Sequence, residues 1–473
     1  MAAPLDRRMT AEASTESTPL VLEAGLGSSR KIRHSTTAQV TASARTAFGG
    51  RFSPEDDVPD QNAMSPAAFV FNMVCDLAPP GMLPLSYGMA MGSGWWVALC
   101  LVPFCMAMAW YSMGLVARAM EKTGEKTFRA VWAKAIGPGT AWVPVLVVFV
   151  VCMGNCVVYS VFFGDLLRSF VRGLGVTGWL GSREAMIILP TLFPLLPLCL
   201  LKDLAALQYS SFFGAAAVLY TLGVMVLRLL DGSYQEGGKY YQDLNANSKP
   251  IIPTGPFEMV QMSSLVLVNT LAVSYMAHYN APKYYRELVD HTVSSFKTVV
   301  AVAMGIACSV YLCSMTVGFL TFGVNSRSVI LHNYSPNDPL ATAAQGAVGA
   351  AIVCSFPLMF CGLREAAIDL AQILAPSLAP FLEDATWINI VSIKLLGVAC
   401  TLSLLLADSA GLVVGVIGAV CGSAIMYIVP SLMFTYAAKQ EDLESKREIF
   451  WVQVLTGYGV LIGIGGLITS LEY

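Results

Sequence analysis

The stretch that decides the fold is SPAAFVFNMVCDLAPPGMLPLSYGMAM, residues 65–91. It is apolar and long enough to cross a bilayer, whose hydrocarbon core needs about 20 residues of helix. Asp76-Leu77-Ala78-Pro79-Pro80-Gly81 stands near its middle. Two consecutive prolines remove two backbone donors and clash with the preceding turn, so the sequence predicts a helix that breaks inside the membrane. Irregular backbone at that depth is tolerated only where it is buried in protein or lines a water-filled cavity.

The predicted break offers backbone groups that can hold ligands. Carbonyl oxygens at the end of the first half-helix suit a cation, and N–H groups at Gly81, Met82 and Leu83 suit a carboxylate. Asp76 is the only acidic residue near the centre of any apolar stretch. Because an isolated carboxylate at that depth is costly, its default interpretation is functional. The alternative to the break is a simple proline kink in a packed helix. The alternative for Asp76 is that the break shifts it to an aqueous vestibule, where it has no direct role.

The rest of the chain has the composition of a multi-pass membrane protein. Of its 473 residues, 56% are hydrophobic and 12% are charged, about half the charged share of soluble proteins. Residues 1–64 are polar and charged and predict a disordered cytoplasmic tail, which leaves residues 65–473 as an all-α membrane domain. Eleven apolar stretches of spanning length occur there, at 65–91, 95–118, 141–168, 184–201, 206–228, 257–279, 295–321, 340–363, 387–407, 411–437 and 449–470.

Basic residues in the connections predict the orientation of the spans. With the N-terminus in the cytoplasm, twenty Lys and Arg residues lie on the cytoplasmic side and seven on the other. Eleven spans then place the C-terminus on the far side. The longest connection, about 229–256, follows the fifth span. Five spans before it and five after it predict two inverted five-helix repeats plus an eleventh helix, which is an architecture of secondary transporters.

The sixth span, the first of the second predicted repeat, ends in SYMAHYNAP, residues 274–282. This polar cluster before a proline predicts a second break, at the position that repeat symmetry pairs with the first. Ser274 and His278 are therefore candidate ligands, and His278 can bind substrate, relay protons or cap a helix end. Lys394, two turns into the ninth span, is expected to extend its amine toward the membrane interface or to meet a buried acceptor.

Several classes of function are excluded by what the sequence contains. The twelve cysteines fall inside apolar stretches, which argues against a disulfide framework, and the four scattered histidines build no metal or haem site. No glycine-rich phosphate loop or basic block is present, so we expect no cofactor and no nucleic acid partner. Catalysis is not supported. The partners that the sequence predicts are a small-molecule substrate and membrane lipid, and no feature specifies an oligomeric state.

Stretches along the whole membrane domain match a known family in their order. They include LPLSYGMAMG (83–92), LPLCLLKDLAALQYSS (196–211), AHYNAPKYYREL (277–288) and SFPLMF (355–360). From about 66 to 470 the chain resembles the amino acid/auxin permease family, and within it the sodium-coupled neutral amino acid transporters. The resemblance implies a leucine-transporter-like fold of inverted five-helix repeats plus an eleventh helix. It also implies transport of a neutral amino acid by alternating access, in the plasma membrane or a vacuolar or lysosomal membrane.

The resemblance also implies roles for individual residues. The first helix break binds the substrate carboxylate through backbone N–H groups, and His278 matches a histidine at the cytoplasmic end of the sixth-helix break. Ser355 matches a sodium-binding Thr, whereas Cys75 stands in place of a sodium-binding Asn, and Pro79-Pro80-Gly81 replaces Gly-Ser-Gly. A thiol is a poor ligand for a hard cation, while Asp76 adds a titratable carboxylate.

We therefore predict coupling by protons, with Asp76 as the main coupling residue. Sodium, held at Ser355 and freed carbonyl groups, is the alternative coupling ion. Some relatives signal amino acid status through an N-terminal tail. A non-transporting amino acid sensor is accordingly the second candidate function.

The charge asymmetry predicts that residues 1 and 473 lie on opposite sides of the membrane. Tags fused to the two termini should differ in protease sensitivity in sealed vesicles, because only one of them faces outward. Permeabilised vesicles, in which both tags should be digested, provide the control. Digestion of both tags in sealed vesicles would show that the number of spans is even.

Overall fold

The computed structural model describes residues 63–92, 94–201, 207–252, 264–382, 384–441 and 446–472. The predicted tail lies almost wholly outside the described residues, as does the segment expected to begin the sixth span. Within the described ranges the regular structure is helical, apart from two isolated backbone bridges of the β type. The predicted all-α class is confirmed.

Nine helices in the described part of the chain are long and apolar enough to cross a membrane, and all nine coincide with predicted spans. Two of them contain π-helical turns within their length. The nine are α4 (Trp95–Thr123), α6 (Trp142–Gly173), α7 (Arg183–Pro190) continuing into α8 (Leu196–Leu200), α9 (Gln208–Leu230), α12 (Val293–Phe322), α13 (Pro339–Leu374), α14 (Ala385–Leu405), α15 (Ala410–Ile417) continuing into α16 (Val429–Glu441), and α17 (Lys446–Glu472).

The two remaining predicted spans are the two that were predicted to break. The first consists of α2 (Pro66–Gly81) and α3 (Leu85–Ala90). The second consists of α10 (Leu265–Ser274), the short 3-10 turn η8 (His278–Asn280) and α11 (Ala281–Glu287). Each is divided by irregular backbone, so both predicted breaks are confirmed. The order of elements is that of two five-span repeats followed by α17.

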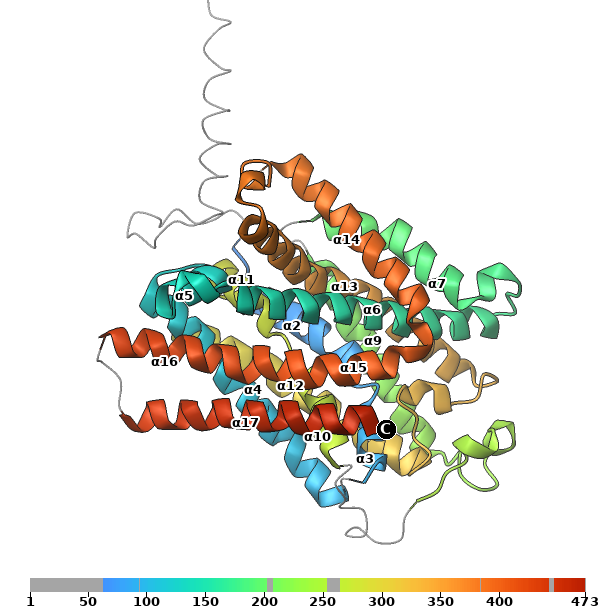
Figure 1. Cartoon of the computed structure of the whole chain (residues 1–473). Coiled ribbons are helices and arrows are strands. Elements are labelled where there is room, and N and C mark those ends of the chain that lie inside the picture. The colour runs from blue at the N-terminus through green and yellow to red at the C-terminus, as the bar shows by residue number, and fades with distance from the viewer. Residues whose placement is uncertain are drawn as a thin grey trace, which may run out of the picture. The chain divides into compact units, whose positions relative to one another are not determined.

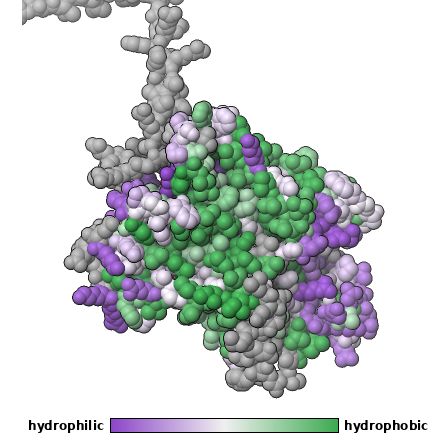
Figure 2. Space-filling view, in the orientation of Figure 1, coloured by the Kyte–Doolittle hydropathy of each residue, from purple (hydrophilic) through white to green (hydrophobic). Residues whose placement is uncertain are grey.

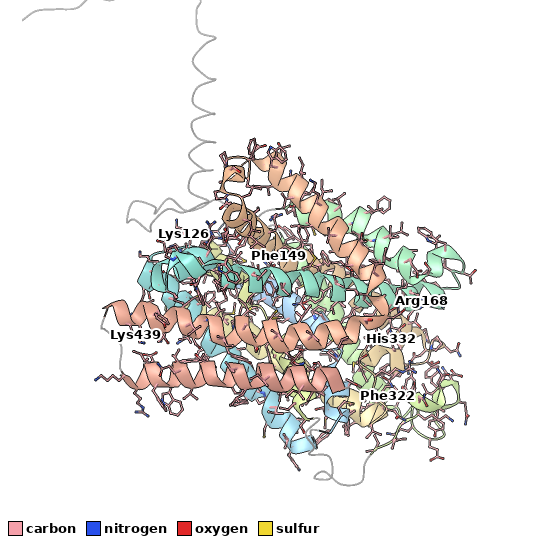
Figure 3. The ribbon with its side chains drawn as sticks, viewed as in Figure 1. Lys126, Phe149, Arg168, Phe322, His332 and Lys439 are labelled. Carbon is pink, nitrogen blue, oxygen red and sulfur yellow. The ribbon has the colours of Figure 1, made fainter. Side chains whose placement is uncertain are left out.

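The broken helix α2 packs against α9, α12 and α13 in the interior of the bundle (Figure 1). Figure 2 shows hydrophobic residues across the middle of the viewed face and hydrophilic residues toward its left and right ends. Lys126 and Lys439 lie at the left end, and Arg168 and His332 lie at the right end (Figure 3). This distribution is typical of a bundle that crosses a membrane from end to end.

At the left end, the chain enters α2 through a contact with the end of the second broken span. The N–H of Met64 donates to Glu287 O at 2.5 Å, and the N–H of Val289 donates to Met64 O at 3.1 Å. Lys283 Nζ lies 3.1 Å from Glu365 Oε1, which ties α11 to α13. Both broken spans are therefore fastened to their neighbours at this end.

At the right end, the long connection after the fifth span folds against the start of α13. Asp338, the N-cap of α13, is fully buried and accepts hydrogen bonds from Arg228 Nη2 at 2.7 Å and from Tyr234 OH at 2.9 Å. Burial, and next the Asp338 carboxylate, raise the pKa of Tyr234, so the phenol stays protonated and donates. This network holds the connection against the bundle.

Asn333, which forms a glycosylation sequon with Tyr334 and Ser335, is buried. Its Oδ1 accepts from the N–H of Arg327 at 2.8 Å, and its Nδ2 donates to Asn325 O at 2.8 Å. A glycan would require the side chain to leave both bonds. We expect protein expressed in eukaryotic cells to show no change in electrophoretic mobility after glycosidase treatment. A mobility shift that disappears in Asn333→Gln would contradict this buried arrangement.

Candidate functional site

The first break lies one turn later than the sequence predicts. Helix α2 continues through the tandem prolines to Gly81, and the irregular residues are Met82–Pro84. The N–H of Met82 donates to Ala78 O at 3.1 Å, so this group is not free to hold a ligand. Pro79 and Pro80 keep a helical φ, so α2 continues through them although both backbone donors are lost. The prediction that the helix unwinds before Gly81 is therefore wrong.

The tandem prolines instead free two carbonyl groups inside α2. Pro79 and Pro80 have no N–H for the carbonyls of Cys75 and Asp76, four residues earlier. The Asp76 carbonyl accepts a hydrogen bond from Tyr159 OH of α6 at 3.3 Å. A neighbouring helix therefore supplies one of the hydrogen bonds that the prolines removed.

The two breaks meet each other, as repeat symmetry predicts. Ser274 Oγ, at the end of α10, lies 3.1 Å from Gly81 O and 2.9 Å from Thr270 O of its own helix, so its proton can go to either carbonyl. Tyr311 OH of α12 lies 2.8 Å from Leu77 O and 2.7 Å from Ser274 O. Beyond Gly81, the Met82 carbonyl accepts from Ser314 Oγ at 3.3 Å. Carbonyl groups of both broken helices are thus satisfied by hydroxyl groups of their neighbours.

Asp76 is buried and has no cationic partner among the described residues. Its Oδ2 accepts a hydrogen bond from Tyr279 OH of η8 at 2.6 Å. Its Oδ1 has no hydrogen-bond partner in the described part of the chain. The residue is 1% exposed, so bulk water does not reach this oxygen. A buried carboxylate in this state requires a proton or a bound cation, because an isolated charge in a low-dielectric interior is very costly.

Tyrosine hydroxyl groups around Asp76 were not identified as site residues from the sequence. Tyr159 and Tyr279 bond to it directly. Tyr284 of α11 follows the same break as Tyr279, and its hydroxyl is buried with no partner among the described residues. The sequence could have indicated these residues, because each is a tyrosine in the middle of an apolar helix or beside a predicted break.

His278 turns toward α4 instead of α2. Its Nε2 lies 2.8 Å from Ser112 Oγ and 3.2 Å from Ala109 O, and the ring is fully buried. Because the Ala109 carbonyl can only accept, a proton on Nε2 fits these contacts. Nδ1 is then a bare acceptor, and it has no partner in the described ranges. His278 and Asp76 therefore occupy different surroundings at the two breaks.

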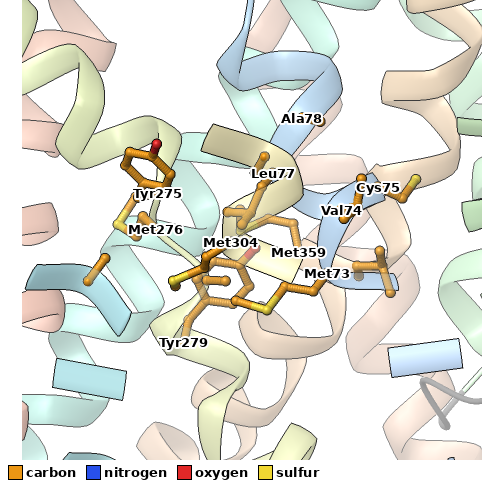
Figure 4. Close-up of a cluster of buried hydrophobic side chains, with 14 of the residues drawn as sticks. Met73, Val74, Cys75, Leu77, Ala78, Tyr275, Met276, Tyr279, Met304 and Met359 are labelled. Carbon is orange, nitrogen blue, oxygen red and sulfur yellow. The ribbon is translucent and has the colours of Figure 1, made fainter. Parts of the chain in front are cut away.

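Cys75 and Ser355 lie in the core near α9 and α13. A Cβ atom on Gly214 of α9 would stand 2.4 Å from Cys75 Sγ and 3.9 Å from Ala351 O. Figure 4 shows Cys75 and Tyr279 on different sides of α2. The hydroxyl of Ser355 donates to Ile352 O of its own helix at 2.9 Å and is buried. The thiol is therefore packed against helix backbone and does not face the second break.

A family model described as "Transmembrane amino acid transporter protein" matches residues 63–471. The chain belongs to this family. "Sodium-coupled neutral amino acid transporter 7" of Mus musculus is 23% identical over 426 residues, which are 87% of this chain and 87% of that protein. The resemblance seen in the sequence is confirmed. The family consists of transporters and not of enzymes, and this amino acid transporter family member is a multi-pass membrane protein.

Two solved transporters resemble this amino acid transporter family member in fold. Mhp1, described as a nucleobase-cation-symport-1 family transporter with bromovinylhydantoin bound, is 13% identical with a TM-score of 0.53, covering 87% of this chain and 91% of its own. MhsT in complex with L-phenylalanine is 11% identical with a TM-score of 0.52, covering 85% of this chain and 98% of its own. Identity this low shows the fold alone, and the leucine-transporter-like fold is confirmed.

The close approach of Tyr311 of α12 to the end of α2 predicts that position 81 of this transporter accepts only glycine. A Cβ atom on Gly81 would lie 2.2 Å from Tyr311 Oη, and Gly81→Ala should lower the free energy of unfolding by about 1–3 kcal/mol. Gly305→Ala on α12 is the matched control, because its added Cβ would meet nothing within 4 Å. Thermal unfolding of the purified variants checks this. Equal unfolding temperatures for the two variants would contradict the close approach.

Proposed function

We propose that the chain is a secondary active transporter of neutral amino acids that works by alternating access. The observation that carries this proposal is the meeting of two broken helices, where Ser274 Oγ lies 3.1 Å from Gly81 O. Broken helices at the same depth expose helix ends and irregular backbone to one small volume. We assign substrate binding to Gly81–Leu83, Ser274 and His278. In this conformation the N–H of Met82 cannot bind substrate, because it already donates to Ala78 O of α2.

The residues around the two breaks favour a substrate with an uncharged side chain. Met82 and Leu83 follow α2 at the first break, and Tyr275, Met276 and Ala277 follow α10 at the second break. None of these side chains carries a charge, and all five are buried. An anionic side chain would find no counter-charge among these five residues and would lose its hydration, and a cationic one would compete with the coupling cation for Asp76. The names of the relatives, which specify neutral amino acids, agree with this inference.

We assign the coupling cation to Asp76. Its carboxylate has one oxygen bonded to Tyr279 and one oxygen without a partner in the described residues. A proton satisfies the second oxygen by neutralising the group, and a sodium ion satisfies it by direct coordination. Cys75 offers only soft sulfur where a hard ion needs oxygen, which favours the proton. The relatives named as sodium-coupled transporters favour sodium, with Ser355 as its further ligand.

The structure is closed around both breaks, which is consistent with one step of an alternating-access cycle. Asp76 is 1% exposed, Ser274 is 5% exposed and His278 is fully buried. Substrate and cation therefore reach these groups only after helices move. The hydrogen bonds of Tyr279 and Tyr311 cross between the two broken helices or their neighbours, so they are contacts that such a movement must change.

An amino acid sensor is the second candidate, and one contact favours it. Met64 forms backbone hydrogen bonds with Glu287 and Val289, at the end of the second broken span. The chain that precedes residue 63 therefore connects directly to a point that both broken helices share. With the tail placed in the cytoplasm, substrate binding at the breaks would act on this junction. A sensor of this kind binds an amino acid without accumulating it.

Uptake of labelled neutral amino acids into proteoliposomes tests the transporter proposal. With proton coupling, uptake should rise as the outside is acidified and persist when choline replaces sodium. A tenfold proton gradient is worth about 1.4 kcal/mol, so coupling of one proton to one substrate sustains accumulation of up to about tenfold. Asp76→Asn should abolish this accumulation while exchange of substrate continues. Binding of substrate by the wild type without any uptake would support the sensor instead.

Asp408→Asn is the matched control, because it removes the same charge from a side chain that is 98% exposed, whereas Asp76 is buried. It should retain the ion dependence of the wild type. If uptake requires sodium and Asp76→Asn loses only that requirement, the coupling ion is sodium at the same residue. An Asp76→Asn variant that still concentrates substrate with unchanged ion dependence would overturn the assignment of Asp76.

A further inference from the structure

Helix α14 is the least covered spanning helix in the described part of the chain. In an apolar stretch of 18 residues of α14, only 22% of the residues are buried inside the bundle, against 83% in the corresponding stretch of α13. Figure 1 shows α14 along the upper margin of the bundle beside α7. Its outward residues include Ile393 and Val398, which are 49% and 48% exposed. In a membrane protein, a face of this kind contacts lipid or another membrane-embedded partner.

A groove runs along this face of α14. It is shallow and open to the outside, and it is lined by residues of this one helix: Lys394, Gly397, Val398, Thr401 and Leu402. These positions follow one another at helical spacing of three and four residues, so they form a single stripe on the helix. A Cβ atom on Gly397 would meet nothing within 4 Å. The absence of a side chain there opens the groove between the lysine and the deeper threonine.

Lys394 places a positive charge at one end of this apolar groove. Its side chain is exposed, and no ion pair or hydrogen bond to it occurs among the described residues. A charged amine against hydrocarbon is costly unless it reaches the interface or meets an anion. The buried acceptor that the sequence left open for this lysine is therefore not found in the described part of the chain. None of the described residues supplies a counter-charge to it.

The direction of the helix decides where the amine can reach. Side chains on a helix point toward its N-terminus, which for α14 is the end that carries Trp387. Trp387 is 45% exposed, as an aromatic anchor at the membrane interface would be. Lys394 lies seven residues further along, or about 10 Å at 1.5 Å per residue. The lysine stem spans much of that distance, so the amine approaches the headgroup level while Thr401 and Leu402 stay deeper.

We propose that the α14 groove binds an anionic phospholipid. The lipid phosphate pairs with Lys394, and one acyl chain lies along Gly397, Val398, Thr401 and Leu402. The charge stands at the shallow end of the groove and the apolar lining at the deep end, which matches the order of headgroup and chain in one leaflet. The lipid supplies the anion that the described chain lacks.

Two other occupants fit the groove less well. A second copy of this chain would have to bring an acidic residue to the same depth, and Asp76, the acid near the middle of a span, is buried. A transmembrane helix of another protein would need a carboxylate at the level of the Lys394 amine and an apolar face along the rest of the groove. A phospholipid carries both features, in this order, in every molecule.

Native mass spectrometry of the full-length protein tests this proposal. The protein is exposed to phosphatidylglycerol and to phosphatidylcholine with identical acyl chains, and the bound ratio is measured. Removing one lysine near the headgroups should reduce the preference for the anionic lipid about fivefold, which corresponds to about 1 kcal/mol. Lys394→Gln should show this loss. Gly397→Leu should reduce the binding of both lipids, because the added side chain fills the groove. The charge of Lys394 is retained in this variant.

Lys239→Gln is the matched control, since Lys239 is also exposed but lies in the connection between α9 and α10, outside the spanning helices. It should leave the lipid ratio unchanged, and all three variants should unfold at the wild-type temperature. An unchanged ratio in Lys394→Gln would overturn the phosphate assignment. Unchanged binding in Gly397→Leu would overturn the acyl-chain assignment. Loss of a co-purified membrane protein in Lys394→Gln, with the lipid ratio unchanged, would replace the lipid by a partner helix.

Discussion

A peptide group inside a bilayer has no water to bond with, so its partner has to come from the protein. Two helices of this chain are interrupted and therefore leave carbonyl groups unsatisfied by their own helical bonds. Tyr159, Ser274 and Tyr311 supply hydroxyl groups to these carbonyls at 3.3 Å or less. The arrangement of α6, α10 and α12 around α2 depends on this requirement. A break in one helix is stable only because the other broken helix and its neighbours lie against it.

The same requirement makes the centre of the bundle responsive to ligands. Oδ1 of Asp76, the Tyr284 hydroxyl and Nδ1 of His278 are buried without partners among the described residues. Unsatisfied polar atoms in a low-dielectric interior cost free energy that a bound proton, cation or substrate can recover. A site built in this way favours occupied states over empty ones. That difference between states is what a coupled transport cycle requires.

Asp76 and Lys394 illustrate two solutions to the problem of a charge within a membrane. The aspartate is enclosed by protein, so it has to be neutralised by a mobile ion or proton. The lysine faces outward on a flexible stem, so it can be neutralised by a component of the membrane itself. Side-chain length and direction decide between these outcomes, because both residues stand well inside apolar helices.

The first break also shows that tandem prolines do not necessarily end a helix. Pro79 and Pro80 remove donors but retain a helical φ, and α2 passes through them. The helix ends at Gly81, three residues before Pro84. A sequence with several prolines therefore predicts that a helix is interrupted more reliably than it predicts at which proline.

By itself, the sequence determined the membrane class, the nine intact spans, the two broken ones and the family, because apolar length and helix-breaking residues act locally along the chain. It also identified Asp76, since a lone acidic residue in an apolar stretch can be recognised from the sequence. Only the tertiary structure decided which groups surround that acid and where His278 turns. Tyr279 and Asp76 are 203 residues apart in sequence but 2.6 Å apart in space. Contacts of this kind depend on how helices pack, and packing is set by side-chain shapes from many segments at once.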